Sequence, residues 1–83
     1  MKVYVVIGST GEYSDRTEWI VCGFLDEEKA QERVLLAGAE ARELFASGES
    51  SRYDSDPINK YDDKFQMGYT GTVYYYATVE VEE

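Results

Sequence analysis

The spacing of apolar residues divides the chain into four regular segments. Residues 2–7 and 17–25 are short runs rich in β-branched and aromatic side chains, which are typical of strands, and the turn-rich residues 8–15 separate them. Residues 26–46 instead repeat apolar side chains about once per helical turn, which predicts a helix. Residues 72–81 alternate like a strand again. The predicted order is strand, strand, helix, strand.

The predicted helix carries its own start and stop signals. Asp26 is a suitable N-cap, and Glu27 and Glu28 follow it at the positive end of the helix dipole. Gly48 is expected to end the helix, whereas Gly38 inside it costs roughly 1 kcal/mol relative to alanine. The helix therefore depends on the packing of one apolar stripe, which consists of Ala30, Val34, Ala37, Ala41, Leu44 and Phe45.

These elements predict an α+β fold with two layers. A chain of 83 residues has room for one small core, so we expect a single domain over residues 1–83. A right-handed crossover from the second strand through the helix to the third leaves the first strand in the middle. The expected result is a three-stranded antiparallel sheet with one helix on one face.

One helix can cover only one face of such a sheet. With strict alternation in each strand, the side chains expected to face the helix are Val3, Val5, Ile7, Ile20, Cys22, Phe24, Val73, Tyr75, Val79 and Val81. The opposite face would then carry Tyr4, Val6, Trp19, Val21, Tyr74 and Tyr76. Exposed patches of this kind usually mark an interaction site, and Trp and Tyr often contribute much of the binding energy. Three interpretations stay open: the long loop covers this face, two copies pack through it, or another protein binds it.

The stretch 47–71 holds the only proline and shows no clean period, which predicts a long loop. Loops beyond about 12 to 15 residues are usually functional or disordered. Its oxygen-bearing side chains could in principle bind a cation; they are Asp54, Asp56, Asn59, Asp62 and Asp63. Their spacing lacks the glycine and the final glutamate of an EF-hand, so we expect solvated turns around Asp56 and Pro57, and no metal.

Composition excludes several function classes. The chain has 17 Asp and Glu residues, 8 Lys and Arg residues and no histidine, which gives a net charge of −9. Direct nucleic-acid binding needs a basic groove, so we do not expect it. The lack of histidine excludes His-dependent catalysis and, with a single cysteine, a structural zinc site. That cysteine, Cys22, is interpreted as a small buried side chain.

We predict neither an enzyme nor a cofactor. Ser9, Thr10 and Ser14 have no basic neighbour that could activate them as nucleophiles. No apolar run approaches the roughly 20 residues of a membrane helix, and the N-terminus does not resemble a secretory signal. We therefore expect a cytoplasmic protein without membrane contact.

The acidity of the chain has two interpretations. A large net charge keeps a small protein in solution. Alternatively, the helix mimics nucleic-acid phosphates and blocks a basic groove on a partner, through Glu27, Glu28, Glu32, Glu40 and Glu43. Mimic binding should weaken steeply with salt, whereas binding through an apolar face should weaken only mildly.

Three passages carry a family resemblance: the opening KVYVVIG, the strand-to-helix step TEWIVCGFLDEEKAQE and the closing YYYATVEVE. With its Lys-Val-Tyr-Val opening and its Phe-x-Asp-x-Glu-Lys-Ala step, the chain resembles small acidic bacteriophage-type proteins. The resemblance implies a fold and a phage setting in the host cytoplasm, and it carries no catalytic residue. It also implies a protein that binds a host protein and inhibits or redirects it, for example in a defence complex.

The expected function is therefore that of a non-enzymatic protein that engages a host protein through the aromatic sheet face. The expected contact residues are Tyr4, Trp19, Val21, Tyr74 and Tyr76. The alternatives are a structural homo-oligomer, in the simplest case a homodimer, that uses the same face, and the acidic nucleic-acid mimic.

Overall fold

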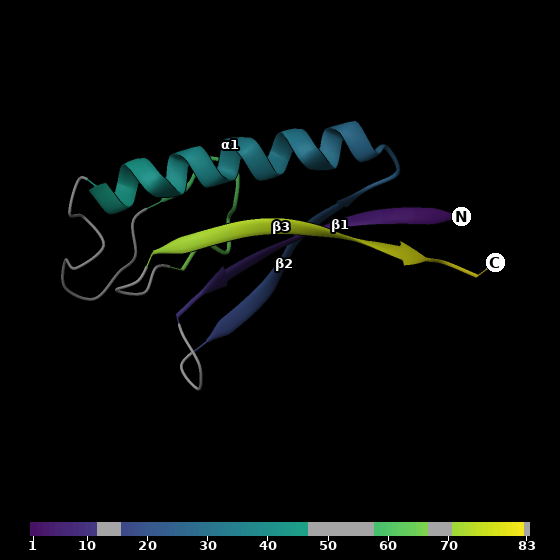
Figure 1. Cartoon of the computed structure of the whole chain (residues 1–83), viewed down its shortest axis with the longest axis horizontal. Helices are drawn as coiled ribbons and strands as arrows, with labels where there is room; N and C mark the ends of the chain where they lie inside the picture. Colours follow the sequence, from purple (N-terminus) through teal and green to yellow (C-terminus); the bar gives the residue numbers. More distant parts are fainter. Residues whose placement is uncertain (12–15, 47–57, 67–70, 83) are drawn as a thin grey trace.

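The computed structural model describes residues 1–11, 16–46, 58–66 and 71–82. Its elements are β1 (Lys2–Thr10), β2 (Thr17–Phe24), α1 (Glu27–Ala46) and β3 (Thr72–Glu80). The three strands form one antiparallel sheet in the order β2-β1-β3, and α1 lies on one side of it (Figure 1). The predicted α+β class, element order and central first strand are confirmed.

β1 is longer than the sequence pattern predicts. It continues through residues 8–10, which were expected to begin a turn. Gly8 pairs with Trp19 on one side and with Tyr74 on the other, so strand pairing on both sides overrides the local turn preference. Thr10 Oγ1 also donates a hydrogen bond to the carbonyl oxygen of Gly71 at 2.7 Å, which fixes the end of β1 to the start of β3.

The start of α1 follows the sequence prediction. The backbone N–H of Glu28 donates to Asp26 Oδ1 at 2.9 Å, and Ala30 N donates to Asp26 O at 3.3 Å, so Asp26 is the N-cap. Only the small residues of the predicted apolar stripe are buried against the sheet. The buried residues of α1 are Ala30, Ala37, Gly38 and Ala41. Val34 and Leu44 are partly buried beside them, whereas Phe45 is 42% exposed.

The predicted choice of sheet face is wrong. Val6 is 0% exposed and Tyr74 is 9% exposed, and Tyr4 and Tyr76 pack against the same core cluster under α1. The exposed side chains are instead those expected to be buried, led by Ile20 at 62% and Val73 at 64%. Tyr75, Val79 and Val81 are also exposed, and Val3, Val5 and Ile7 are partly exposed. Of the sheet side chains that were predicted to face the helix, only Cys22 and Phe24 pack against the core cluster.

The size of the helix side chains explains this reversal. Close packing requires that the space between two layers be filled by the side chains of both. Ala30, Ala37, Gly38 and Ala41 contribute little volume, so the sheet must supply large side chains opposite them. The tyrosines at even positions of β1 and β3 and the tryptophan of β2 are large enough to fill this space. The valines of the other face are smaller and would leave cavities.

A bulge in β2 explains why alternation failed there as well. Val6 pairs with Cys22 and Ile7 pairs with Ile20, so Val21 is the extra residue that opposes no partner. The bulge shifts the side-chain alternation, and Trp19 and Cys22 therefore share the helix side of the sheet. Ile20 and Cys22, which strict alternation places together, lie on opposite faces.

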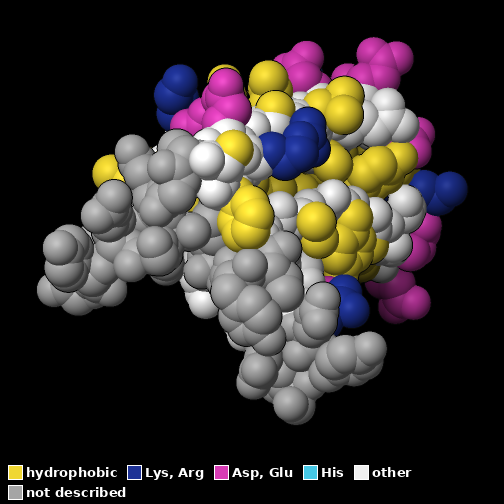
Figure 2. Space-filling model, turned by 60° about the vertical axis from the view of Figure 1, so that its left-hand side comes forward, with side chains coloured by type: hydrophobic (Ala, Val, Ile, Leu, Met, Phe, Trp, Pro, Cys, Tyr) yellow, Lys and Arg dark blue, Asp and Glu magenta, His cyan; other side chains and the backbone are white. Residues whose placement is uncertain are grey.

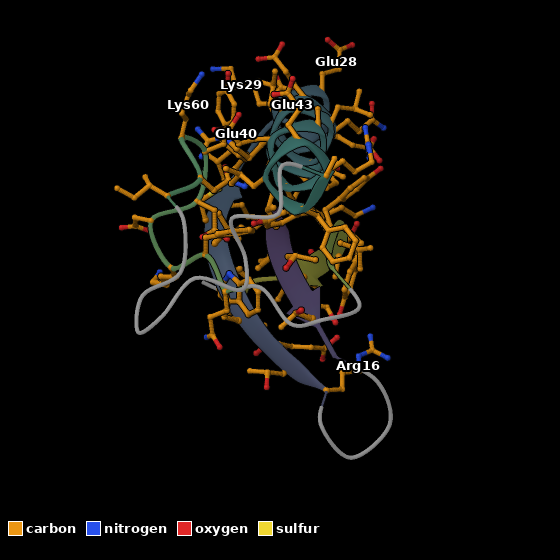
Figure 3. The ribbon with its side chains drawn as sticks, turned by 90° about the vertical axis from the view of Figure 1, so that its left-hand side faces the viewer. Arg16, Glu28, Lys29, Glu40, Glu43 and Lys60 are labelled. Carbon is orange, nitrogen blue, oxygen red and sulfur yellow. The ribbon has the colours of Figure 1, made fainter. Side chains whose placement is uncertain are left out.

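The segment 58–66 completes the helix layer. Seen along the molecule in Figure 3, α1 lies over β1 and β3, and residues 58–66 lie beside the helix over β2. Trp19 occupies the same side of the sheet and lies across Gly8, where an added Cβ atom would come within 2.6 Å of its ring atoms Cε2 and Cζ2. Only glycine at position 8 leaves room for the indole.

We predict that Gly8→Ala lowers the free energy of unfolding by about 1 to 3 kcal/mol, because the new methyl group overlaps the indole of Trp19. Gly38→Ala is the matched control: its Cβ atom would meet only Arg42 Nη1 at 3.7 Å. That helical substitution should raise stability by up to about 1 kcal/mol. Urea unfolding followed by circular dichroism measures both, and equal effects of the two substitutions would contradict the packing of Trp19 on Gly8.

Candidate interaction surface

A buried polar cluster joins the segment 58–66 to the sheet and to the helix. Asp62 Oδ2 accepts hydrogen bonds from Trp19 Nε1 at 2.8 Å and from Tyr74 Oη at 2.7 Å. Asn59 Nδ2 donates to the carbonyl oxygen of Ala37 at 3.1 Å and to Tyr74 Oη at 3.4 Å. Asn59 and Asp62 are each 3% exposed. We call these four side chains, Trp19, Asn59, Asp62 and Tyr74, the Asp62 cluster.

Local turns hold Asn59 and Asp62 in place. Asn59 Oδ1 accepts from the backbone N–H of Tyr61 at 2.9 Å, and Asp62 Oδ1 accepts from that of Lys64 at 3.0 Å. The sequence predicted turns of this kind around Asp56 and Pro57, which lie outside the described residues. It missed the buried pair, although the signal was present: Asn59, Asp62 and Phe65 recur every third residue, and Phe65 is buried.

Asn59 and Asp62 therefore stabilise the fold through their buried side chains. Within the described residues, acidic and cysteine side chains do not gather in a group of three that could hold a metal ion. Asp54 and Asp56, the other members of the predicted loop set, lie outside the described residues.

The five predicted contact residues do not form an uncovered face. Tyr4, Val21 and Tyr76 pack against the core, and the rings of Tyr4 and Tyr76 meet edge to face with centroids 6.3 Å apart. Trp19 and Tyr74 belong to the Asp62 cluster. Of the three interpretations of the aromatic face, coverage by the loop is the one seen for Trp19 and Tyr74, and the helix covers the remainder. The correction follows from the small side chains of α1 and from the bulge in β2.

The uncovered side of the sheet is aliphatic. Because antiparallel partners place their side chains on the same face, the register assigns one continuous surface to the side away from α1. We call it the open face; it comprises Val3, Val5, Ile7, Ile20, Val73, Tyr75, Ala77 and Val79. The exposed fractions of Val79 and Tyr75 are 45% and 38%. The sheet therefore offers water a row of apolar side chains from all three strands.

The charged groups beside the open face neutralise each other. Glu18 Oε2 accepts hydrogen bonds from Tyr75 Oη at 2.7 Å and from Arg16 Nη2 at 2.8 Å. The hydrogen bond from Tyr75 lowers the pKa of Glu18 most. Desolvation opposes this shift, but the hydrogen bond and the positive charge of Arg16 add to it, so the pKa stays below its ordinary value. The same contact with Glu18 raises the pKa of Tyr75. This end of the open face thus carries an ion pair with no net charge.

The acidic helix residues do not form a uniform negative row. Glu27 Oε2 accepts a hydrogen bond from Tyr76 Oη at 2.9 Å, so this carboxylate is tied to the sheet. Figure 3 looks along α1 and shows that Lys29 projects from the same side of the helix as Glu40 and Glu43, with Lys60 on the neighbouring segment 58–66. Glu28 and Glu32 are exposed on the helix. Positive charges therefore interrupt the predicted acidic surface.

Cys22 is only partly buried, whereas the sequence predicted a buried side chain. Burial raises the pKa of its thiol, and the positive charge of Arg33 opposes that shift only in part. Arg33 Nη1 lies 3.7 Å from Cys22 Sγ and 3.3 Å from the carbonyl oxygen of Tyr61, and the guanidinium lies over the ring of Phe24. The thiol is therefore protonated at neutral pH and packs as a small apolar side chain.

Comparison with protein-family models, with curated proteins and with solved structures finds no match to this chain. In the part of the chain that the structure describes, no helix has the length and apolar character needed to cross a membrane. The open face is the candidate site.

We predict that Asp62→Ala lowers the free energy of unfolding by about 2 to 4 kcal/mol, because Trp19 Nε1 and Tyr74 Oη lose a shared buried acceptor. Asp63→Ala, an exposed carboxylate one residue further on, serves as the control and should change stability by less than about 0.5 kcal/mol. Thermal unfolding measures both. Equal destabilisation would show that the buried hydrogen bonds of Asp62 contribute nothing.

We predict that the protein loses stability at alkaline pH because the pKa of Tyr74 is raised in the folded state. Burial, and then the hydrogen bond to Asp62 and its negative charge, raise the pKa of Tyr74 well above its ordinary value of about 10. Above pH 10 the unfolded chain releases this proton while the folded chain keeps it, so the folded state loses stability as the pH rises further. Tyr74→Phe should remove this part of the slope in urea unfolding series between pH 8 and about pH 11. An unchanged slope would contradict the assignment.

Proposed function

We propose that this chain is a non-enzymatic binding protein whose open face engages an apolar surface of a partner protein. The observation that carries the proposal is the exposure of aliphatic side chains from all three strands on one continuous face, with Ile20 and Val73 more than 60% exposed. The predicted surface moves from the aromatic to the aliphatic side of the sheet, but the class of function stays the same.

The size of the open face supports this proposal. Three strands at a spacing of about 4.8 Å and nine residues at about 3.4 Å each span roughly 14 by 30 Å, or about 400 Å². The largest apolar patch on a typical monomer covers about 300 to 600 Å² and is often functional, and the open face falls within this range. Burial of such a face against a partner releases ordered water and favours binding.

The distribution of charge adds selectivity. Arg16 and Glu18 neutralise each other next to the open face, so its burial would not strand an unpaired charge. The net charge of −9 belongs to the rest of the molecule and would speed the approach of a partner with a basic surround. The resemblance to bacteriophage-type proteins implies that the partner is a host protein that is inhibited or redirected.

The nucleic-acid mimic has less support. A phosphate mimic needs a regular row of negative charges, whereas Lys29 projects from the same side of α1 as Glu40 and Glu43 and Glu27 is bonded to Tyr76. No described cluster favours an enzyme over a binding protein, and the apolar face favours the latter.

We predict that the double variant Ile20→Ser, Val73→Ser loses partner binding by about tenfold or more while it keeps its fold, because both side chains are exposed. Ile58→Ser is the matched control, since Ile58 is an apolar residue that is 84% exposed outside the open face. Tagged versions of the three proteins would be compared by quantitative mass spectrometry of the proteins they retain from host lysate.

A protein retained by the wild type and by Ile58→Ser but not by the double variant supports the proposal, and its retention should weaken only mildly with salt. Equal retention by all three proteins would contradict it. Retention that disappears steeply with salt but not with the double variant would favour the acidic helix instead.

A further inference from the structure

β3 is an edge strand without the usual protection of such strands. Its outer side has no strand partner among the described residues, and its pairing with β1 runs without a break from Thr72 to Glu80. Glu80, at the very end, is its only charged residue, and it contains no proline. Natural proteins rarely leave a long, flat and apolar edge exposed, because it can pair with another chain.

The opposite edge of the sheet, β2, carries three of the common protections. Val21 forms a bulge, Glu18 places a charge on the strand, and Lys64 Nζ donates a hydrogen bond to the carbonyl oxygen of Ile20 at 3.1 Å. The two edges of one small sheet are thus treated differently. Among the described residues, the β3 edge thus lacks the protections that the β2 edge has.

The backbone groups available at this edge follow from the register. The N–H of Val81 donates to the carbonyl oxygen of Met1 at 2.7 Å, on the inner side of the strand. In an antiparallel ladder residues alternate between bonding inward and outward, so the odd-numbered residues of β3 bond to β1. The even-numbered residues turn their N–H and C=O groups outward; these are Thr72, Tyr74, Tyr76, Thr78 and Glu80.

The helix flank above β3 is also suited to burial. Gln31 Nε2 donates to Tyr76 Oη at 3.1 Å, which places Gln31 on the β3 side of α1, whereas Arg33 points to Tyr61 on the other side. Leu35 lies one helical turn after Gln31, on the same flank, and is 70% exposed. Figure 2 shows hydrophobic side chains gathered across this part of the surface, with the acidic side chains mostly along its upper and right margins.

We propose that two copies of this chain pair antiparallel through β3 and form a six-stranded continuous sheet with both helices on one side. The interaction goes beyond the partner binding proposed above and uses a different surface, because the open face remains free and is doubled in area. The two-fold axis passes at Tyr75 of each copy.

The placement of this axis follows from the helix. Gln31 of α1 bonds Tyr76, and Asn59 connects Ala37 of α1 to Tyr74. Leu35 lies between these two points of the helix, so along the direction of β3 it lies level with Tyr75. Pairing about Tyr75 therefore brings Leu35 level with Leu35 of the second copy. In antiparallel helices Arg42 then stands level with Glu28 of the second copy, since both lie seven residues from Leu35. Glu80 falls outside the paired stretch and meets no like charge.

The helices have room in this arrangement. Because α1 lies over β1 and β3 in Figure 3, strands about 4.8 Å apart would place the two helix axes about 10 Å apart, the usual distance for packed helices. The paired stretch of seven residues makes the seam about 25 Å long. With the helix on the sheet it is about 20 Å high, which gives about 500 Å² per copy. The total of about 1,000 Å² is typical of weak interfaces, so the dimer should form at high concentration and dissociate on dilution.

A second copy fits this edge better than a foreign strand. The stretch 72–78 carries no charge, so the repulsion expected between two chains of charge −9 is smallest along this seam. The exposed Leu35 also gains an identical apolar neighbour, which a single added strand would not supply.

Sedimentation of the full chain over a wide concentration range tests the dimer. Thr78→Pro removes an outward N–H and blocks pairing, while the fold tolerates proline at an edge position. We expect it to raise the dimer dissociation constant by about tenfold or more. Thr78→Ala, which keeps the N–H, should leave the dissociation constant unchanged. Circular dichroism checks that both variants are folded.

Leu35→Glu tests the helix flank without touching the strand. It should also shift the chain to the monomer, whereas Leu25→Glu, at a leucine with the same 70% exposure, should not. A wild type that stays monomeric at every concentration would overturn the proposal. So would a dimer that survives both Thr78→Pro and Leu35→Glu. Dissociation of the dimer by Ile20→Ser alone would also overturn it, because Ile20 lies on β2, at the far edge of the sheet, and this result would place self-association on the open face. Loss of the dimer with partner binding retained leaves the proposed function intact.

Discussion

The small side chains on the inner side of α1 are the constraint on which the rest of this structure depends. Ala30, Ala37, Gly38 and Ala41 let the helix approach the sheet closely but fill little of the space between the layers. Large side chains from the sheet must fill it, and the aromatic face of the sheet is therefore the buried one. The aliphatic face is left to water as a consequence.

A single helix of this kind does not reach across three strands, and the polar segment 58–66 supplies the missing cover. Its anchoring is unusual for a small core, because it relies on a buried carboxylate that accepts from Trp19 and Tyr74 rather than on apolar contacts alone. A buried carboxylate is tolerated only where such donors satisfy it. Gly8 belongs to the same arrangement, since it gives the indole of Trp19 the space to reach Asp62.

The proposed surfaces are what remains once these requirements are met. The open face is exposed because α1 covers the other side. Among the described residues the β3 edge has no partner strand, because the segment 58–66 lies over β2, where Lys64 also binds the backbone. The two surfaces are contiguous along β3, so pairing of two copies through the edge would extend the open face without covering it. Self-association and partner binding are thus compatible in one molecule.

The sequence by itself determined the order of the elements, the strand order and the capping of α1 at Asp26, because periodicity and caps are local properties of the chain. It also identified which side chains alternate together in β3. Which face of the sheet is buried was decided only by the tertiary structure, since that depends on matching side-chain volumes between α1 and strands distant in sequence. The bulge at Val21 and the burial of Asn59 and Asp62 were likewise decided there. The bulge arises from pairing with β1. Asp62 is buried where Trp19 and Tyr74 donate to it, and Asn59 where Ala37 O and Tyr74 Oη accept from it.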